Sequence, residues 1–142
     1  MNIELLEKDK VYYLASPYSH NTSEIKNLRY EAVDLVGAKL YEAGITIIEP
    51  IASCHHKSIK FDLPTGYEYW KKRDRAFVQM CTGGIIVLCL PGWMESVGVS
   101  DEVHYAKTLG YDVFYLTLAD LQEHKLQVEL EELDFKYMTE SR

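Results

Sequence analysis

One glycine-rich stretch of the sequence has residue types suited to binding an anion. It runs from Pro91 to Lys107, PGWMESVGVSDEVHYAK, and follows directly on the apolar run IIVLCL. Gly92 and Gly98 permit tight turns and the close approach of a ligand. Free amides at the start of the predicted helix attract negative charge, and Ser96 adds a hydroxyl beside them. The stretch therefore predicts an anion site, while a simple helix cap remains the alternative role for Ser96.

Two carboxylates border apolar stripes at helical spacing. Glu102 lies three residues after Val99 and four before Ala106, so it points toward a cleft near the anion site. Asp74 borders the stripe of a second predicted helix in the same way, although a local ion pair with its flanking arginines is the alternative. If both reach one cleft, repulsion and partial burial raise the pKa of one of them. That one can then donate a proton while the other stays ionised.

These residues must be positioned by alternating strands and helices. Apolar runs predict strands at residues 11–15, 45–48, 85–90 and 113–116. Helical spacing follows each strand: from a cap at residues 21–23 to Gly44, over 67–80, from the glycine-rich stretch to Gly110, and over 118–133. Residues 51–66 show no clear period, and Pro64 to Gly66 suggests a loop.

This alternation predicts the fold class. Parallel strands need helix-sized connections, so we expect an α/β fold: a doubly wound, flavodoxin- or Rossmann-like three-layer sandwich with a parallel sheet of four to five strands. At 142 residues the chain makes one domain, with a core of about residues 11–116 and a helical C-terminal extension over 117–142. Ligands of such folds bind beyond the carboxyl ends of the strands, where the candidate residues lie.

Composition excludes several classes of function. A net charge of −7 disfavours a nucleic acid polymer as partner. No apolar run approaches the roughly 20 residues of a membrane span, and the charged N-terminus is unlike a signal peptide, so we expect a cytoplasmic protein. Three cysteines without CxxC spacing argue against a disulfide framework and a zinc site.

Three motifs together resemble a known superfamily. YLASPYS after the first strand, W-x3-D from Trp70 to Asp74, and GW-x2-S-x-G-x3-E from Gly92 to Glu102 are similar to segments of the nucleoside 2-deoxyribosyltransferases and the related nucleoside 5′-monophosphate N-glycosidases. The chain is most similar to an uncharacterised, largely phage and bacterial branch of that superfamily, so the expected location is the host cytoplasm if the chain is phage-encoded. The resemblance spans about residues 11–116.

The resemblance implies roles by position. Glu102 matches the nucleophile that attacks the anomeric carbon, Asp74 matches the carboxylic residue that helps protonate the leaving base, and Tyr13 matches a tyrosine that orients the nucleophile. Six residues before the nucleophile, transferases of free nucleosides tend to have Asp, whereas monophosphate-cleaving members have Ser. The Ser96 found here suits a phosphate, which an Asp would repel. Together with Gly92 and Gly98, it forms the expected phosphate site.

Four further residues are weaker candidates. Ser16 lies in the first loop, where many members have small residues, and its presence alters the expected phosphate pocket. Arg29 can reach an anion from the first helix or lie on the surface. Trp93 can cover a base or pack against the strand end. His55 can contact a nucleobase or belong to an ordinary loop, and with His56 adjacent it makes a poor metal site.

The expected function is hydrolysis of the N-glycosidic bond of a (deoxy)nucleoside 5′-monophosphate. The partner is then a small nucleotide or nucleoside, no cofactor or metal is needed, and the resemblance implies a homodimer or larger homo-oligomer. Two alternatives stay open: a 2-deoxyribosyltransferase that exchanges bases, and a nucleotide-binding module without catalysis.

Overall fold

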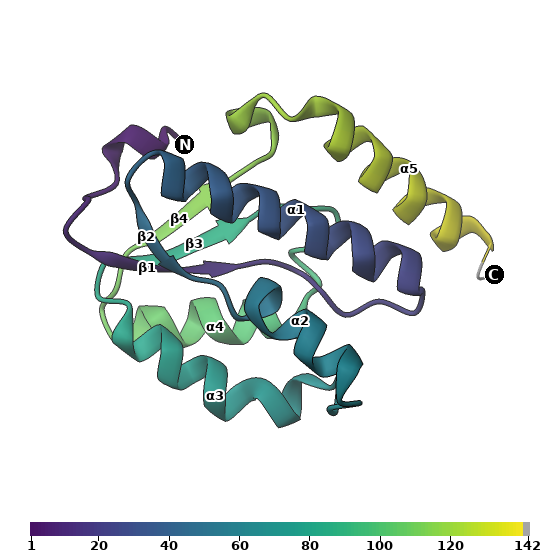
Figure 1. The fold of residues 1–142 in the computed structure, drawn as a ribbon, viewed down its shortest axis with the longest axis horizontal. Helices are drawn as coiled ribbons and strands as arrows, with labels where there is room; N and C mark the ends of the chain where they lie inside the picture. The colour runs from purple at the N-terminus through teal and green to yellow at the C-terminus, as the bar shows by residue number, and fades with distance from the viewer. Residues whose placement is uncertain (141–142) are drawn as a thin grey trace.

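A computed structural model of the chain describes residues 1–140 (Figure 1). In chain order the main elements are β1 (Val11–Ala15), α1 (Ser23–Glu42), β2 (Thr46–Ile48), α2 (Pro50–Lys60), α3 (Tyr67–Met80), β3 (Gly84–Leu88), α4 (Val97–Thr108), β4 (Val113–Leu116) and α5 (His124–Glu140). Two short 3-10 helices, η1 (Ile3–Leu5) and η2 (Ala119–Leu121), precede β1 and α5.

The four strands form one parallel sheet in the order β2-β1-β3-β4. From β1 the chain crosses through α1 to β2 on one side, and after α2 and α3 it returns to β3 on the other side. The connections therefore diverge between β1 and β3, which is the position where doubly wound sheets bind their ligands. The predicted α/β doubly wound sandwich is confirmed.

Helices cover both faces of the sheet, with α1 and α5 on one side and α3 and α4 on the other (Figure 1). Alternate residues of β1 serve the two cores, as the twofold period of a strand requires. Tyr12 and Leu14 pack in the core beneath α1, while Tyr13 and Ala15 pack in the core with α3 and α4. Tyr13 therefore faces the same layer as the helices that carry Asp74 and Glu102.

Most predicted elements are confirmed, and β1, α3 and β4 have the predicted bounds. Thr22 caps α1 by accepting from the amide of Ile25. The absence of a period over residues 51–66 hid one helix, because Pro50 begins the 11-residue α2, whereas the loop predicted at Pro64 to Gly66 is confirmed. Of its side chains only Pro50 and His55 are buried, with Ile51 and Ala52 partly buried against the core, so few apolar positions mark α2 in the sequence.

The C-terminal helix is longer than predicted and begins later. A turn at η2 ends with Gln122 in the left-handed conformation, and α5 then runs from His124 to Glu140. Leu130 is fully buried in the core beneath α1. Among the described residues, no helix is both long enough and apolar enough to span a membrane.

Candidate active site

A cleft of about 1000 Å³ lies at the carboxyl ends of the strands. Its walls come from the loops after β1 and β3, from α2, and from the N-terminal parts of α3 and α4. Eight of the ten residues predicted for the site line this cleft: Ser16, Arg29, His55, Asp74, Gly92, Ser96, Gly98 and Glu102.

Glu102 is a buried carboxyl held by a tyrosine. It lies on α4 with 6% of its surface exposed, and the hydroxyl of Tyr13 on β1 donates a hydrogen bond to its Oε2. Burial raises the pKa of Glu102 well above its usual range, and the negative charge of Asp74 adds to the effect. The hydrogen bond from Tyr13 acts in the other direction, because it stabilises the ionised form.

Asp74 is also buried, but it has no comparable partner among residues 1–140. Its Oδ1 has no hydrogen-bond partner within the described part of the chain, and burial raises its pKa to about 7. The flanking arginines are directed elsewhere. Arg75 binds Asp101 with Nε 2.9 Å from Oδ2, and Arg73 donates to the carbonyl of Tyr69. A local ion pair is therefore not the role of Asp74.

The two carboxyls line one cleft, and the negative charge of Asp74 raises the pKa of Glu102. Two such groups titrate as a pair, so one proton remains between them over a range in which isolated carboxyls are fully ionised. An arrangement of this kind supplies an acid and a nucleophile from the same residue type.

The N-terminus of α4 forms another part of the wall. Ser96 caps the helix, since its Oγ accepts from the amide of Val99 at 3.2 Å. The amides of the first helical turn have no acceptor within the helix, so they favour an anion. Gly98 packs closely against Tyr67: a Cβ added at this position would lie only 3.2 Å from the ring. Both predicted roles of Ser96, cap and anion site, are compatible with this geometry.

Ser16 adds a hydroxyl to the cleft from the end of β1. Only 4% of the residue is exposed, and its Oγ has no hydrogen-bond partner among the described residues. A buried hydroxyl without a partner is costly unless a ligand or water satisfies it. The position is therefore suited to a polar group of a bound molecule.

His55 and Trp93 have different surroundings. His55 stacks on Tyr30 with ring centroids 4.0 Å apart and shares a hydrogen bond with Tyr18. Burial and the nearby Lys26 lower the pKa of His55, which favours a neutral ring in the cleft wall. Trp93 is absent from the residues that line the cleft, and its ring lies 5.5 Å from that of Tyr115 at the strand end.

Tyr67 is a cleft residue that the sequence analysis missed. It lies at the start of α3, and its hydroxyl donates to Asp101 of α4 at 2.9 Å. Arg75 binds the same carboxylate, so the two helices that carry Asp74 and Glu102 are fastened together. The sequence contained a signal for this residue. Tyr67 precedes Asp74 by seven residues, which is two helical turns, so both lie on the same face of the helix.

Among the described residues, no group of three or more His, Cys, Asp or Glu side chains is arranged to hold a metal ion. Comparison with protein families gives one match: residues 10–118 fit the model of a family described as "Domain of unknown function (DUF1937)". The matched range includes every residue of the cleft and ends before α5. No curated protein matches the chain.

Proposed function

We propose that this chain, which belongs to the DUF1937 family, hydrolyses the N-glycosidic bond of a (deoxy)nucleoside 5′-monophosphate and releases a free base and a sugar 5-phosphate. The observation that carries the proposal is the buried carboxyl pair. Glu102, held by Tyr13, and Asp74, without a hydrogen-bond partner for its Oδ1 among the described residues, line one cleft beside the N-terminus of α4. The motif resemblance to nucleoside 5′-monophosphate N-glycosidases adds support.

The proposed reaction has two steps. In the first, the C1′–N bond breaks through an oxocarbenium-like transition state while Glu102 attacks C1′, and Asp74 gives its proton to the departing base. Protonation of the leaving group contributes roughly 10²–10⁴-fold. In the second step water attacks C1′, the bond to Glu102 breaks, and the ionised Asp74 accepts a proton from the water.

The distribution of the proton between the carboxyls favours these roles. Burial raises the pKa of both groups, so the free site retains a proton near neutral pH. Tyr13 donates to Glu102 and opposes the rise in the pKa of that carboxyl, and we propose that this hydrogen bond places the charge on Glu102 and the proton on Asp74. Positive charge developing at C1′ strengthens this preference.

The phosphate is proposed to bind at the N-terminus of α4. Ser96, Gly98 and the first-turn amides offer hydrogen-bond donors there. The hydroxyl of Ser16, which has no hydrogen-bond partner in the part of the chain that the structure describes, lies in the same cleft. Gly92 lets the preceding loop turn, with φ at +89°. The α2 wall with His55 is then available for the base.

A test of the reaction type uses a deoxynucleoside 5′-monophosphate and a second free base as acceptor. Liquid chromatography should show free base and sugar phosphate. Formation of the swapped nucleotide instead identifies a transferase, and no turnover across a nucleotide panel identifies a binding module.

We further propose that the chain acts as a homodimer or larger homo-oligomer, as the resemblance implies. Sedimentation velocity should give at least twice the monomer mass at the concentration used for activity. A monomer that retains full turnover would contradict this part of the proposal.

A further inference from the structure

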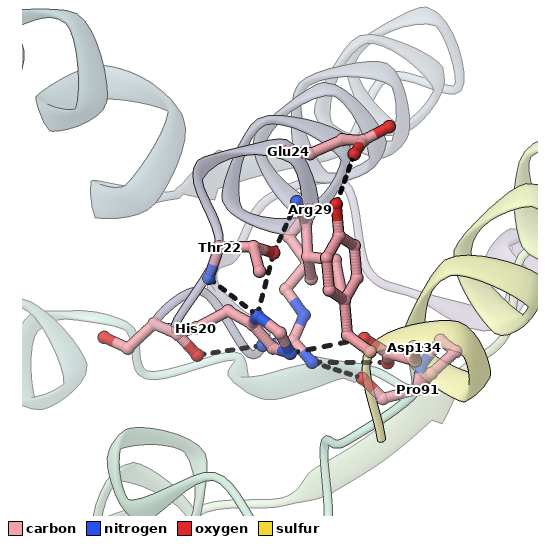
Figure 2. A network of polar contacts seen from close by, with 9 residues as sticks. His20, Thr22, Glu24, Arg29, Pro91 and Asp134 are labelled. Atoms are coloured by element: carbon pink, nitrogen blue, oxygen red, sulfur yellow. Dashed lines mark hydrogen bonds and ion pairs between the residues drawn. The ribbon is translucent and has the colours of Figure 1, made fainter. Parts of the chain in front are cut away.

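A buried arginine joins the two loops that flank the ligand-binding position of the sheet (Figure 2). Arg29 of α1 is only 5% exposed. Its Nη1 donates to the carbonyl of Ser19 in the loop after β1, and its Nη2 donates to the carbonyl of Pro91 in the loop after β3, both at 2.9 Å. The guanidinium therefore fixes the separation of these loops.

The loop after β3 approaches Arg29 so closely that position 92 requires glycine. Gly92 has φ at +89°, and a Cβ at this position lies 2.7 Å from Nη2 of Arg29. A side chain there would displace either the loop or the guanidinium. Gly92, which the sequence analysis placed at the phosphate site, is thus also the contact point between the loop and Arg29.

The counter-charge for Arg29 comes from α5. Asp134 lies with Oδ2 3.4 Å from Nη2 of Arg29 and Oδ1 3.7 Å from Nε2 of His20 (Figure 2). Nδ1 of His20 accepts from the amide of Thr22 at 3.1 Å, so the proton of a neutral ring is on Nε2, facing Asp134. Asp134 thus contacts a residue of the first loop as well as the arginine that holds both loops.

We infer that Asp134 is a positioning residue and that α5 holds the loops at residues 16–22 and 89–96 in the geometry that binds the anionic end of the substrate. The inference rests on the proposed function for the identity of that substrate. A buried cation that loses its counter-charge is strongly destabilised. Without Asp134, Arg29 will turn toward solvent and release the two carbonyls, and both loops will open more often.

Hydrogen exchange tests this inference without depending on turnover. We expect Asp134→Asn and Asp134→Ala to speed amide exchange in residues 16–22 and 89–96 by roughly tenfold, with exchange in β1 and β3 unchanged. Glu132→Gln, an exposed carboxyl two residues earlier on α5, is the matched control and should match the parent. Arg29→Lys keeps the charge but loses the forked geometry, and it should also loosen both loops.

Kinetics provide the second measurement. With a nucleoside 5′-monophosphate that the parent cleaves, the Asp134 variants should raise KM roughly tenfold and leave kcat nearly unchanged, because the carboxyl pair is not touched. Unchanged loop exchange in both Asp134 variants, or an equal effect of Glu132→Gln, would overturn the inference. If the parent releases no base while the Asp134 variants still loosen the loops, the proposed function fails and the role of Asp134 stands.

Discussion

At the scale of single residues, the proposed chemistry depends on which of two buried carboxyls carries a proton, and the hydrogen bond from Tyr13 influences that choice. Tyr13 and Glu102 lie on different elements, 89 residues apart in sequence, and both are almost fully buried. A hydrogen bond in such surroundings has a large effect on charge, since water does not compete for either partner. The arrangement makes the ionisation of Glu102 sensitive to one hydroxyl.

Tyr13→Phe tests this dependence. Loss of a hydrogen bond to a charged group costs about 1.5–3 kcal/mol, so kcat/KM should fall roughly 10- to 100-fold. The pKa of Glu102 should rise further, and the acidic limb of the pH profile should move to higher pH. The matched control is Tyr12→Phe, which removes a hydroxyl that accepts from the amide of Glu7 on the opposite face of the sheet. If both variants have the same pH profile as the parent, Tyr13 does not orient the carboxylate.

At the scale of elements, the N-terminus of α4 combines a structural and a binding role in Ser96. The two roles can be separated because Asp is as good an N-cap as Ser, while Ala is a poor one. Ser96→Asp should keep the stability of the parent and raise KM for a nucleoside monophosphate by roughly tenfold or more through charge repulsion. Ser96→Ala should instead lower stability by about 1 kcal/mol.

Thermal unfolding and initial rates for the monophosphate and the free nucleoside check this prediction. Ser96→Asp should spare whatever activity the parent has on the nucleoside. An equal loss on both substrates would show that Ser96 does not face the phosphate.

The sequence predicted those elements whose buried faces follow a simple period. β3 is apolar on both faces, and α3 has Trp70, Phe77 and Met80 at helical spacing, so their types and approximate bounds were readable, although Met80 is exposed in the structure. The two carboxylates were found for the same reason, because each borders such a stripe. The pattern of α2 is weaker, because few of its side chains are buried, and this helix was missed although its His55 is a cleft residue.

Long-range partners were not readable from the pattern. Nothing in the spacing of Arg29 indicates that its hydrogen bonds reach Ser19 and Pro91, or that Asp134 lies opposite it 105 residues later. The sequence analysis predicted either contact with an anion or a surface position for Arg29. Such pairings depend on the packing of α5 against α1, which the local pattern does not specify.

At the scale of the whole molecule, the buried carboxyls make the fold less stable as the pH rises. The pKa of Asp74 is about 7 in the folded chain, against an ordinary value of 3.8 for an aspartate, so the folded state binds the proton more tightly. The stability associated with this proton is fully present below pH 3.8 and is lost as the pH rises through about 7. Two buried carboxyls thus lower the stability of the fold at neutral pH, as expected of residues kept for function rather than for stability.

Asp74→Asn should remove this pH-dependent loss of stability, because an amide side chain does not titrate in this range. Compared with the parent, the variant should gain stability as the pH rises from 4 to 8, by a difference on the order of 3 kcal/mol at the upper end. Urea unfolding at several pH values measures it, with Glu31→Gln, an exposed carboxyl on α1, as the control. A difference that does not change with pH would mean that Asp74 is ionised in the folded chain throughout.

The most direct test of the proposed chemistry is base release measured by liquid chromatography across a panel of nucleoside monophosphates, with the parent, Glu102→Ala and Asp74→Asn compared at equal concentration. We predict that the parent frees the base from at least one nucleotide and that each variant loses most of this activity, with the folded state intact by circular dichroism. Base release by both variants at the parental rate would contradict the central claim.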